Sequence, residues 1–484
     1  MKIPIHLRIL TVGMATSLTA CVSVGPDYHR PEAPTPERYK ELGDWKPIEP
    51  KPAASDLAWW SIYDDPTLDA LERQVSVSNE SLKASEANYR QALELVNESR
   101  AGYWPTVSLN ASGQRQRVES TPPGSHYVFN QINPSLGASW APDIWGKIRR
   151  TVESSAASAQ ASAADLAAAR LSLQSMLATD YFALRIDDEL KRLYEQTVKA
   201  YEETLEITRN QFEAGTAAET DVITAETQLL GEQAQLIGIG VQRAQLEHAI
   251  AVLIGKTPDQ FSIAPVTLVR NVPVVPAGVP STLLERRPDI AAAERTTAAA
   301  SAQIGVAIAA YFPSITLTGS AGFAGSALAG LFQTANYVWS TGAQLSEILF
   351  DAGLRAAQVG AARAAYDASV ASYRQTVLTA FSQVEDELAA LRILEQQEEV
   401  LKRTVESARE AVRLTIYQYE AGTVAYTAVV TVQAIALTDE QNLLTTLGNQ
   451  LAASVALVNA LGGGWNSAML AEGSAVEPSS SSPH

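Results

Sequence analysis

The sequence of 484 residues contains one cysteine, Cys21, and five histidines that are scattered along the chain. A single cysteine excludes a disulfide framework and a zinc site built from several cysteines. The chain also lacks a phosphate-binding glycine loop, a serine nucleophile elbow and the spacing of a metal site. We therefore expect no enzymatic activity, no cofactor and no bound metal.

Positive charge and long apolar runs are scarce as well. The net charge is −17, and it becomes −19 if residues 1–20, with Lys2 and Arg8, are removed. An acidic chain is repelled by nucleic acid, so we expect no nucleic-acid partner. After residue 20 there is no run of about 18 apolar residues, the minimum for a spanning helix. Any membrane crossing is expected to be made by strands.

The N-terminus has the pattern of a lipoprotein signal peptide. Two basic residues precede an apolar run that ends in LTAC at residues 18–21. This pattern predicts a signal peptide over residues 1–20 and attachment of diacylglycerol to Cys21. Val22, which is not an aspartate, favours sorting to the outer membrane.

A proline-rich segment follows the cysteine. Its composition predicts that residues 21–66 form a lipid-anchored, extended strap lying on another surface. A short amphipathic helix is expected at Asp56–Tyr63, with Trp59 and Trp60 as apolar anchors.

The rest of the chain is a tandem duplication. RNQFEAGTAAETDV at residues 209–222 returns as YQYEAGTVAYTAVV at residues 417–430, an offset of 207. Repeats of one length indicate one duplicated architecture. We place the first repeat at residues 67–270 and the second at 271–465, followed by a serine-rich tail, residues 466–484, that is expected to be disordered.

Long helical patterns dominate both repeats. Residues 146–212 contain no proline, and a helix of this length would extend about 100 Å. Shorter return helices are predicted at Ala217–Ile254 and Val424–Leu461, and the first helix of each repeat at 67–102 and 282–310. Coiled-coil spacing is present in the second repeat at Val370, Tyr373, Val377, Phe381, Val384, Leu388 and Leu391.

A Glu-Ala-Gly-Thr turn joins the long helix of each repeat to its return helix. Gly215 and Gly422 are predicted to end the long helices in the left-handed conformation. Thr216 and Thr423 are predicted to lie near the N-caps of the return helices and to accept hydrogen bonds there. The turns could be ordinary helical hairpins or functional tips.

Period-two patterns predict two strands in each repeat. The predicted strands are residues 103–116, 132–145, 311–324 and 337–350, with loops at 122–130 and 325–334. Aromatic residues gather at the strand ends, as at the interfaces of a membrane barrel, although core aromatics of soluble hairpins are the alternative. They are Tyr103, Trp104, Trp140, Trp145, Tyr311, Phe312, Tyr337, Trp339 and Phe350.

Four strands cannot cross a membrane alone, because open sheet edges leave backbone groups unsatisfied in hydrocarbon. A barrel must therefore be shared between chains. Two chains give eight strands, whose interior is filled by side chains, and three give twelve, which begins to leave a lumen.

Five motifs carry a resemblance to a known family: LTACVSVGPDYHRP at the start, FEAGTAAETDV at 212–222, LERRPDIAAAE at 284–294, YFPSITLTGSAG at 311–322 and LGGGW at 461–465. With these motifs in this order, the whole mature chain resembles the TolC-like outer-membrane factors, and most closely their lipoprotein efflux branch. The resemblance implies a mainly α fold with membrane β structure. It further implies a homotrimer with a shared twelve-strand β-barrel, four strands per chain, continued by a long periplasmic α-helical barrel.

The resemblance also implies a function. The chain would be a passive exit duct in the outer membrane that receives small toxic compounds from a periplasmic adaptor (membrane fusion) protein and an inner-membrane RND-type pump. Type I protein secretion is the alternative within the family. A lipid-anchored periplasmic coiled-coil scaffold is the alternative outside it.

Two groups of site residues follow from the resemblance. Gly215, Thr216, Gly422 and Thr423 would form the tips that meet the adaptor. Candidates for a periplasmic gate are Glu219, Asp221, Tyr417, Tyr419 and Glu420. Thr431 occupies a position where family members often carry an aspartate, which puts an acidic ring from that helix in doubt.

Overall fold

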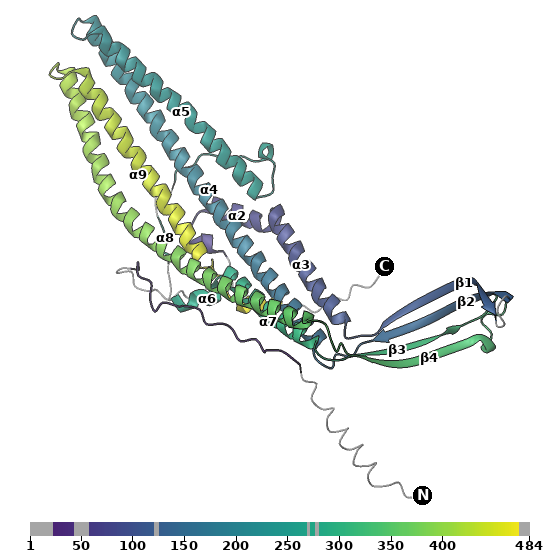
Figure 1. The fold of residues 1–484 in the computed structure, drawn as a ribbon. Coiled ribbons are helices and arrows are strands. Elements are labelled where there is room, and N and C mark those ends of the chain that lie inside the picture. Colours follow the sequence, from purple (N-terminus) through teal and green to yellow (C-terminus); the bar gives the residue numbers. More distant parts are fainter. Residues whose placement is uncertain (1–22, 43–57, 121–124, 269–271, 276–279, 474–484) are drawn as a thin grey trace. The chain divides into compact units, whose positions relative to one another are not determined.

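The computed structural model describes residues 23–42, 58–120, 125–268, 272–275 and 280–473 (Figure 1). The signal peptide, Cys21 and the first residues of the helix expected at Asp56–Tyr63 lie outside them. In chain order the elements are η2 (Trp59–Tyr63), α2 (Pro66–Ser78), α3 (Glu80–Ala101), β1 (Thr106–Ser120), β2 (Ser125–Trp140), α4 (Lys147–Glu213), α5 (Glu219–Leu253), η3 (Pro258–Gln260), η4 (Pro280–Thr282), α6 (Leu283–Arg286), α7 (Pro288–Ala309), β3 (Ser314–Phe323), η5 (Thr334–Asn336), β4 (Tyr337–Ser346), α8 (Leu354–Glu420), α9 (Tyr426–Ala460) and α10 (Ala468–Gly473).

The duplication is confirmed element by element. The long helices α4 and α8 both have 67 residues, and the return helices α5 and α9 both have 35. Helices α3 and α7 match as well, with 22 residues each. The tail was expected to be disordered from Asn466, but residues 468–473 form the short helix α10.

The first helix of each repeat is broken, which corrects the prediction of continuous helices at 67–102 and 282–310. Asn79 separates α2 from α3 with an extended backbone, and its side-chain Oδ1 accepts a hydrogen bond from the amide of Leu82 at 3.0 Å. Arg287 separates α6 from α7, because the residue before Pro288 is excluded from the helical region. Asparagine is a preferred N-cap, which explains why α3 begins there.

Both breaks are tied to the end of a return helix. The side-chain amide of Asn79 donates to the carbonyl oxygen of Leu253 at 2.8 Å, and Nη1 of Arg287 donates to that of Ala460 at 2.9 Å. Leu253 and Ala460 are the last residues of α5 and α9. We call these two contacts the latches. Each latch satisfies a carbonyl that the end of a helix leaves without a partner.

The four strands form one antiparallel sheet in the order β1-β2-β3-β4. β1 and β2 pair over their whole lengths, whereas β2 pairs with β3 only over Ser135–Trp140. The first hairpin therefore extends beyond the second (Figure 1). The loop predicted at 122–130 is wrong from Ser125 onward, because the strand formers Tyr127, Val128 and Phe129 extend β2.

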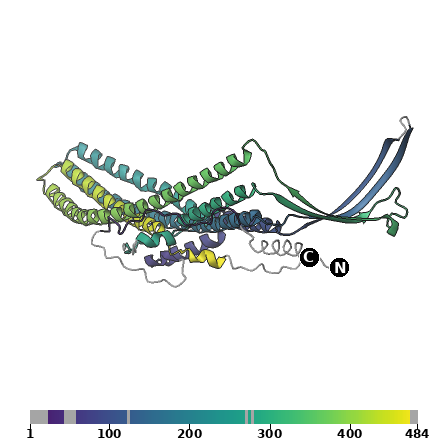
Figure 2. The same ribbon diagram turned by 60° about the horizontal axis from the view of Figure 1, so that its bottom comes forward.

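Contacts divide the chain into two units, and each unit takes segments from both repeats. The first consists of residues 1–32, 88–162 and 292–373 and contains the whole sheet. The second consists of residues 33–87, 163–291 and 374–484 and contains both hairpin turns, where the α4–α5 and α8–α9 pairs lie side by side (Figures 1 and 2). Among the described residues, none of the helices combines the length and apolar character needed to cross a membrane.

The coiled-coil stripe predicted on α8 is buried. Within the second unit Val377, Val384 and Leu388 are at most 4% exposed. In the first unit, α4 and α7 pack through alanine side chains, where Ala157, Ala298 and Ala299 form a buried cluster. Close helix packing in that unit thus depends on small side chains.

Glu72 is the most deeply buried acid among the described residues of the second unit. Glu72 on α2 is fully buried, and neither carboxylate oxygen has a hydrogen-bond partner among the described residues. Burial raises the pKa of Glu72 to about 9. The folded protein therefore holds this group as the neutral acid, while the unfolded chain ionises it near its ordinary pKa of 4.5.

We expect Glu72→Gln to remove part of the pH dependence of stability. A raised folded pKa on an acid costs stability as pH rises from about 5 to 9, by up to about 1.4 kcal/mol per pH unit. Thermal unfolding of the wild type at pH 5.5 and 8.5 should therefore differ more than that of the variant. Glu98→Gln, at an exposed glutamate on α3, is the control. An unchanged pH response in Glu72→Gln would contradict the buried neutral acid.

Candidate functional site

The sheet has two chemically different faces. Register places Val107 opposite Ala138 and Leu109 opposite Leu136, and the same face continues through Ala321 of β3. Leu109 is 75% exposed in the single chain. An extended apolar face of this kind marks a surface made to meet lipid or another chain.

The opposite face is polar. The side chains that alternate with the apolar ones are mostly serine, threonine, asparagine and glutamine, as in Ser108, Asn110, Thr316 and Gln344. The apolar exceptions on this face are Val118, Tyr127, Phe129 and Val338. Ser320 and Ser340 hydrogen-bond across β3 and β4 on this face at 2.9 Å. Within the described strands, β1 and β4 each have one edge without a partner.

The predicted aromatic residues fall at both ends of the sheet. Seven lie at the end next to the helices, where Trp145 stacks on Phe312 at 4.8 Å and the indole of Trp140 donates to the carbonyl of Tyr103. The other two, Tyr337 and Trp339, begin β4 at the far end. The seven are Tyr103, Trp104, Trp140, Trp145, Tyr311, Phe312 and Phe350.

Further aromatic residues at the far end were missed by the sequence analysis. Tyr127 stacks on Phe129 at 5.7 Å, and Phe323 contacts both Phe332 and Tyr337. Tyr127 and Phe129 could not be found because they lay in the segment predicted as a loop. The sheet thus carries aromatic groups at both ends with few between them.

The two hairpin turns are the second candidate surface. Gly215 and Gly422 have φ of +75° and +68°, which confirms the predicted left-handed helix ends. The amides of Gly215 and Thr216 donate to the carbonyls of Phe212 and Gln211, both at 2.9 Å, and the second turn repeats this pattern. This is a Schellman motif, which needs glycine at its left-handed position.

The threonines act differently from the prediction. The hydroxyl of Thr216 donates back to the carbonyl of Gln211 at 2.9 Å, and Thr423 does the same to Gln418 at 2.8 Å. They therefore close the preceding helix instead of capping the next one. The helix α5 is capped instead by Asp221, whose carboxylate accepts from the amide of Ala218 at 3.4 Å.

The gate candidates separate into two groups. Glu219, Tyr417 and Glu420 are exposed, and Asp221 is half-buried. Tyr419 is only 5% exposed, because its ring packs on Tyr426 at 5.4 Å in the core between the two hairpins.

A polar layer behind the tips joins the hairpins. The hydroxyl of Tyr426 donates to Gln228 at 3.3 Å, and Gln433 donates from its amide to the hydroxyl of Thr204 at 3.2 Å. Polar groups at coiled-coil core positions specify one register. The helical pattern alone gave no sign that these glutamines face one another.

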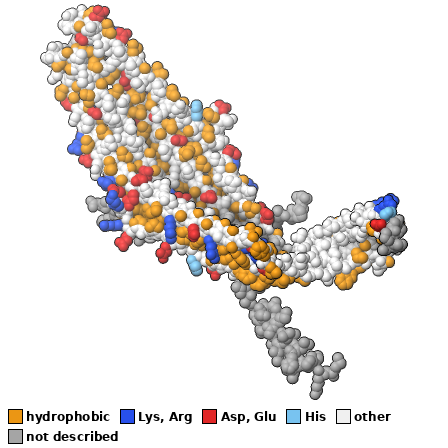
Figure 3. Space-filling model, viewed as in Figure 1, with side chains coloured by type: hydrophobic (Ala, Val, Ile, Leu, Met, Phe, Trp, Pro, Cys, Tyr) orange, Lys and Arg blue, Asp and Glu red, His pale blue; other side chains and the backbone are white. Residues whose placement is uncertain are grey.

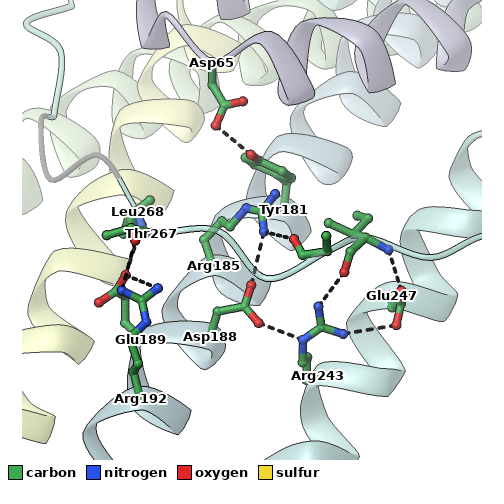
Figure 4. Close-up of polar contacts among 12 residues, drawn as sticks. Asp65, Tyr181, Arg185, Asp188, Glu189, Arg192, Arg243, Glu247, Thr267 and Leu268 are labelled. Atoms are coloured by element: carbon green, nitrogen blue, oxygen red, sulfur yellow. Dashed lines mark hydrogen bonds and ion pairs between the residues drawn. The ribbon is translucent and has the colours of Figure 1, made fainter.

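A buried ionic network holds the linker between the repeats (Figure 4). Asp188 of α4 pairs with Arg185 at 3.1 Å and with Arg243 of α5 at 2.7 Å. Both arginines also donate to the linker, Arg185 to the carbonyl of Ala264 and Arg243 to that of Ile263. The sequence analysis missed this network, because charges on a long helix usually face solvent.

The strap is fixed by specific contacts. In the first unit the amide of Val24 donates to the carbonyl of Trp145 at 3.1 Å, and Arg150 pairs with Asp27 at 2.8 Å, which lowers the pKa of Asp27. In the second unit the amides of Lys40 and Glu41 donate to the Glu385 carboxylate. Residues 23–42 thus have no regular helix or strand and lie on other elements, as predicted.

The described residues hold no group of three or more histidine, cysteine, aspartate or glutamate side chains placed to bind a metal ion. Their notable features are surfaces: a two-faced sheet and two exposed hairpin tips. These define a protein that presents a lipid-compatible sheet and long helical hairpins.

The chain belongs to the outer membrane efflux protein family, whose model matches residues 71–256 and 279–463. It is 31% identical over 462 residues to the probable efflux pump outer membrane protein TtgC of Pseudomonas putida, covering 94% of this chain and 96% of the relative. The solvent efflux pump outer membrane protein SrpC of Pseudomonas putida is 33% identical, with 92% and 96% covered. The solved outer-membrane channel OprN is similar with a TM-score of 0.85 and 29% identity, covering 91% of this chain and 99% of that one.

Proposed function

We propose that this protein is the outer-membrane exit duct of a tripartite efflux system. It passively conducts drugs or other small toxic compounds that a periplasmic adaptor and an inner-membrane RND-type pump deliver. Family membership and the names of the relatives support this role. The structural observation that carries it is the sheet, whose exposed apolar face suits lipid and whose polar face suits a water-filled lumen.

The duct is a homotrimer in this proposal. The free edges of β1 and β4 would pair with neighbouring copies, so that three chains close a barrel of twelve strands. The long hairpins would continue the same tube on the periplasmic side.

The tips meet the adaptor. Gly215, Thr216, Gly422 and Thr423 are exposed at the ends of long arms, and their small size permits close approach of a partner's helices. Glu219, Asp221, Tyr417 and Glu420 are retained as gate candidates. Tyr419 contributes indirectly, by holding the two hairpins together.

The lipid anchor is Cys21. Val24 is fixed beside Trp145 at the helix end of the sheet, so an anchor three residues earlier would start near the aromatic residues that mark a membrane interface. The intact mass of the mature protein tests this, since an unmodified Cys21 contradicts it.

We expect deletion of the gene to raise ethidium accumulation and to lower the inhibitory concentration of pump substrates at least about fourfold, because the compounds lose their exit through the outer membrane. The wild-type gene should restore both. Accumulation of a secreted protein inside the deletion strain, with drug susceptibility unchanged, would favour type I secretion instead. Release by alkaline carbonate of a Cys21→Ser variant exported with a non-lipoprotein signal peptide, which carries no lipid, would favour the lipid-anchored coiled-coil scaffold.

We expect single cysteines to report the topology. Cys21 is kept in each of these variants, because it is the proposed lipid anchor. Ser326→Cys, in the exposed loop between β3 and β4, should react with an impermeant maleimide on intact cells. Thr216→Cys at the hairpin tip should react only after the outer membrane is permeabilised. Labelling of the tip with protection of the loop would reverse the orientation.

A further inference from the structure

Charge is almost absent from the sheet, and what there is lies at one end. The acidic, basic and histidine residues of the four strands all lie in the hairpin of β1 and β2. They are Arg115, Arg117, Glu119 and His126. They belong to the part of the hairpin that extends beyond β3. Figure 3 shows basic, acidic and histidine side chains gathered at the end of the sheet away from the helices.

The two arginines share a face with the apolar side chains. Because side chains alternate along a strand, Val107, Leu109, Arg115 and Arg117 point to one side of β1. Gln114 and Gln116 point to the other and hydrogen-bond to each other at 3.2 Å. In the proposed barrel the arginines therefore face outward, where exported compounds do not pass.

Both guanidinium groups are available for a ligand. Arg115 and Arg117 are exposed, and no hydrogen bond or ion pair joins either of them to another described residue. Their partners across the hairpin are Asn130 and Val128, neither of which is acidic. Glu119 lies opposite His126 instead. Glu119 shares this face two residues beyond Arg117, so this end of the face carries two cations and one anion in a chain whose net charge is −17.

The distance of Arg115 and Arg117 from the start of β1 matches the thickness of the apolar part of an outer membrane. Arg115 and Arg117 follow Val107 by eight and ten residues, about 26 to 33 Å along the strand, or roughly 20 to 25 Å after a tilt of about 40°. Outer-membrane barrels have an apolar band about 25 Å tall. The arginines would thus leave the hydrocarbon where the headgroups of the outer leaflet begin.

We infer that Arg115 and Arg117 bind the phosphate groups of lipopolysaccharide in the outer leaflet. This inference rests on the proposed placement in the outer membrane. Guanidinium groups hold phosphate through paired, charge-assisted hydrogen bonds, and the neighbouring apolar face accommodates the acyl chains of the same molecule. The site combines these two chemistries on one side of one hairpin.

The test compares R115Q/R117Q with a matched control, R90Q/R100Q, which removes two exposed arginines from α3 in the same unit. Each protein is purified from outer membranes in mild detergent, and the lipid A that co-purifies is quantified by mass spectrometry. Delipidated protein is then titrated with bisphosphorylated lipid A, with dephosphorylated lipid A and with inorganic phosphate.

We expect R115Q/R117Q to retain several-fold less lipid A and to bind the bisphosphorylated form about tenfold more weakly. R90Q/R100Q and R115K/R117K should retain more than R115Q/R117Q, and inorganic phosphate alone should not compete. Equal retention by R115Q/R117Q and wild type, or equal binding of both lipid A forms by wild type, would overturn the inference. Displacement by millimolar phosphate would assign the site to a free anion and overturn it as well.

The same preparation separates this inference from the proposed function. Wild-type protein absent from the outer-membrane fraction would defeat the proposed function itself. Wild-type protein present there, with normal efflux but no phosphate-dependent lipid binding, would defeat only the role of the two arginines.

Discussion

Gly215→Trp and Gly422→Trp are expected to abolish efflux in cells that contain the complete pump, while the protein remains folded and reaches the outer membrane at its normal level. A Cβ at either glycine meets no other atom within 4 Å, so the indole would extend into open space. Inside the protomer the cost is the left-handed backbone, about 1–2 kcal/mol. Outside it, the bulk would occupy the surface proposed for the adaptor.

Gly215→Ala and Gly422→Ala are the matched controls, because they carry the same backbone strain without the bulk. Ethidium accumulation and drug susceptibility should be close to wild type for alanine and close to the deletion strain for tryptophan. Immunoblots of outer-membrane fractions check the amount of protein. Normal efflux by the tryptophan variants would remove the docking role from these turns, and failure of the alanine variants would assign the loss to strain.

Much of the fold could be predicted because its signals are local. A glycine followed by threonine between two apolar-periodic segments specifies a hairpin, and the repeat of that signal 207 residues later specifies the duplication. The length of α4 followed from the absence of proline over residues 146–212, and the duplication extends that expectation to α8. The surfaces of the sheet followed from period-two alternation.

The features that escaped prediction depend on contacts between distant segments. Asn79 continues the helical pattern of its neighbours, and its role as an N-cap became visible only with its bonds to Leu82 and to the distant Leu253. The same holds for the ion pair between Arg243 and Asp188, which lie 55 residues apart in the sequence. Tyr419 was a gate candidate because the resemblance places the gate near the tip and its side chain is bulky and polar, whereas its packing against Tyr426 places it in the core.

Gly462→Ala is expected to destabilise the protein far more than Gly422→Ala, although both glycines follow a long helix and both have positive φ, +92° and +68°. The difference lies in the surroundings. At Gly422 an added methyl group would meet nothing, whereas at Gly462 it would overlap the carbonyl oxygen of Arg286, next to the latch residue Arg287. The backbone of Arg286 cannot move away from residue 462 without breaking the neighbouring hydrogen bond from Arg287 to Ala460.

We expect a loss of about 1–2 kcal/mol for Gly422→Ala from strain alone, and of at least about 3 kcal/mol for Gly462→Ala from strain and displaced backbone together. Urea unfolding of the purified proteins measures both values. The first repeat provides an independent pair, since a methyl group at Gly255 would overlap the carbonyl oxygen of Ser78 beside Asn79, while Gly215 is open. Equal losses at Gly462 and Gly422 would show that the latches do not constrain the ends of the return helices, because strain, which the two positions share, would then account for the whole effect.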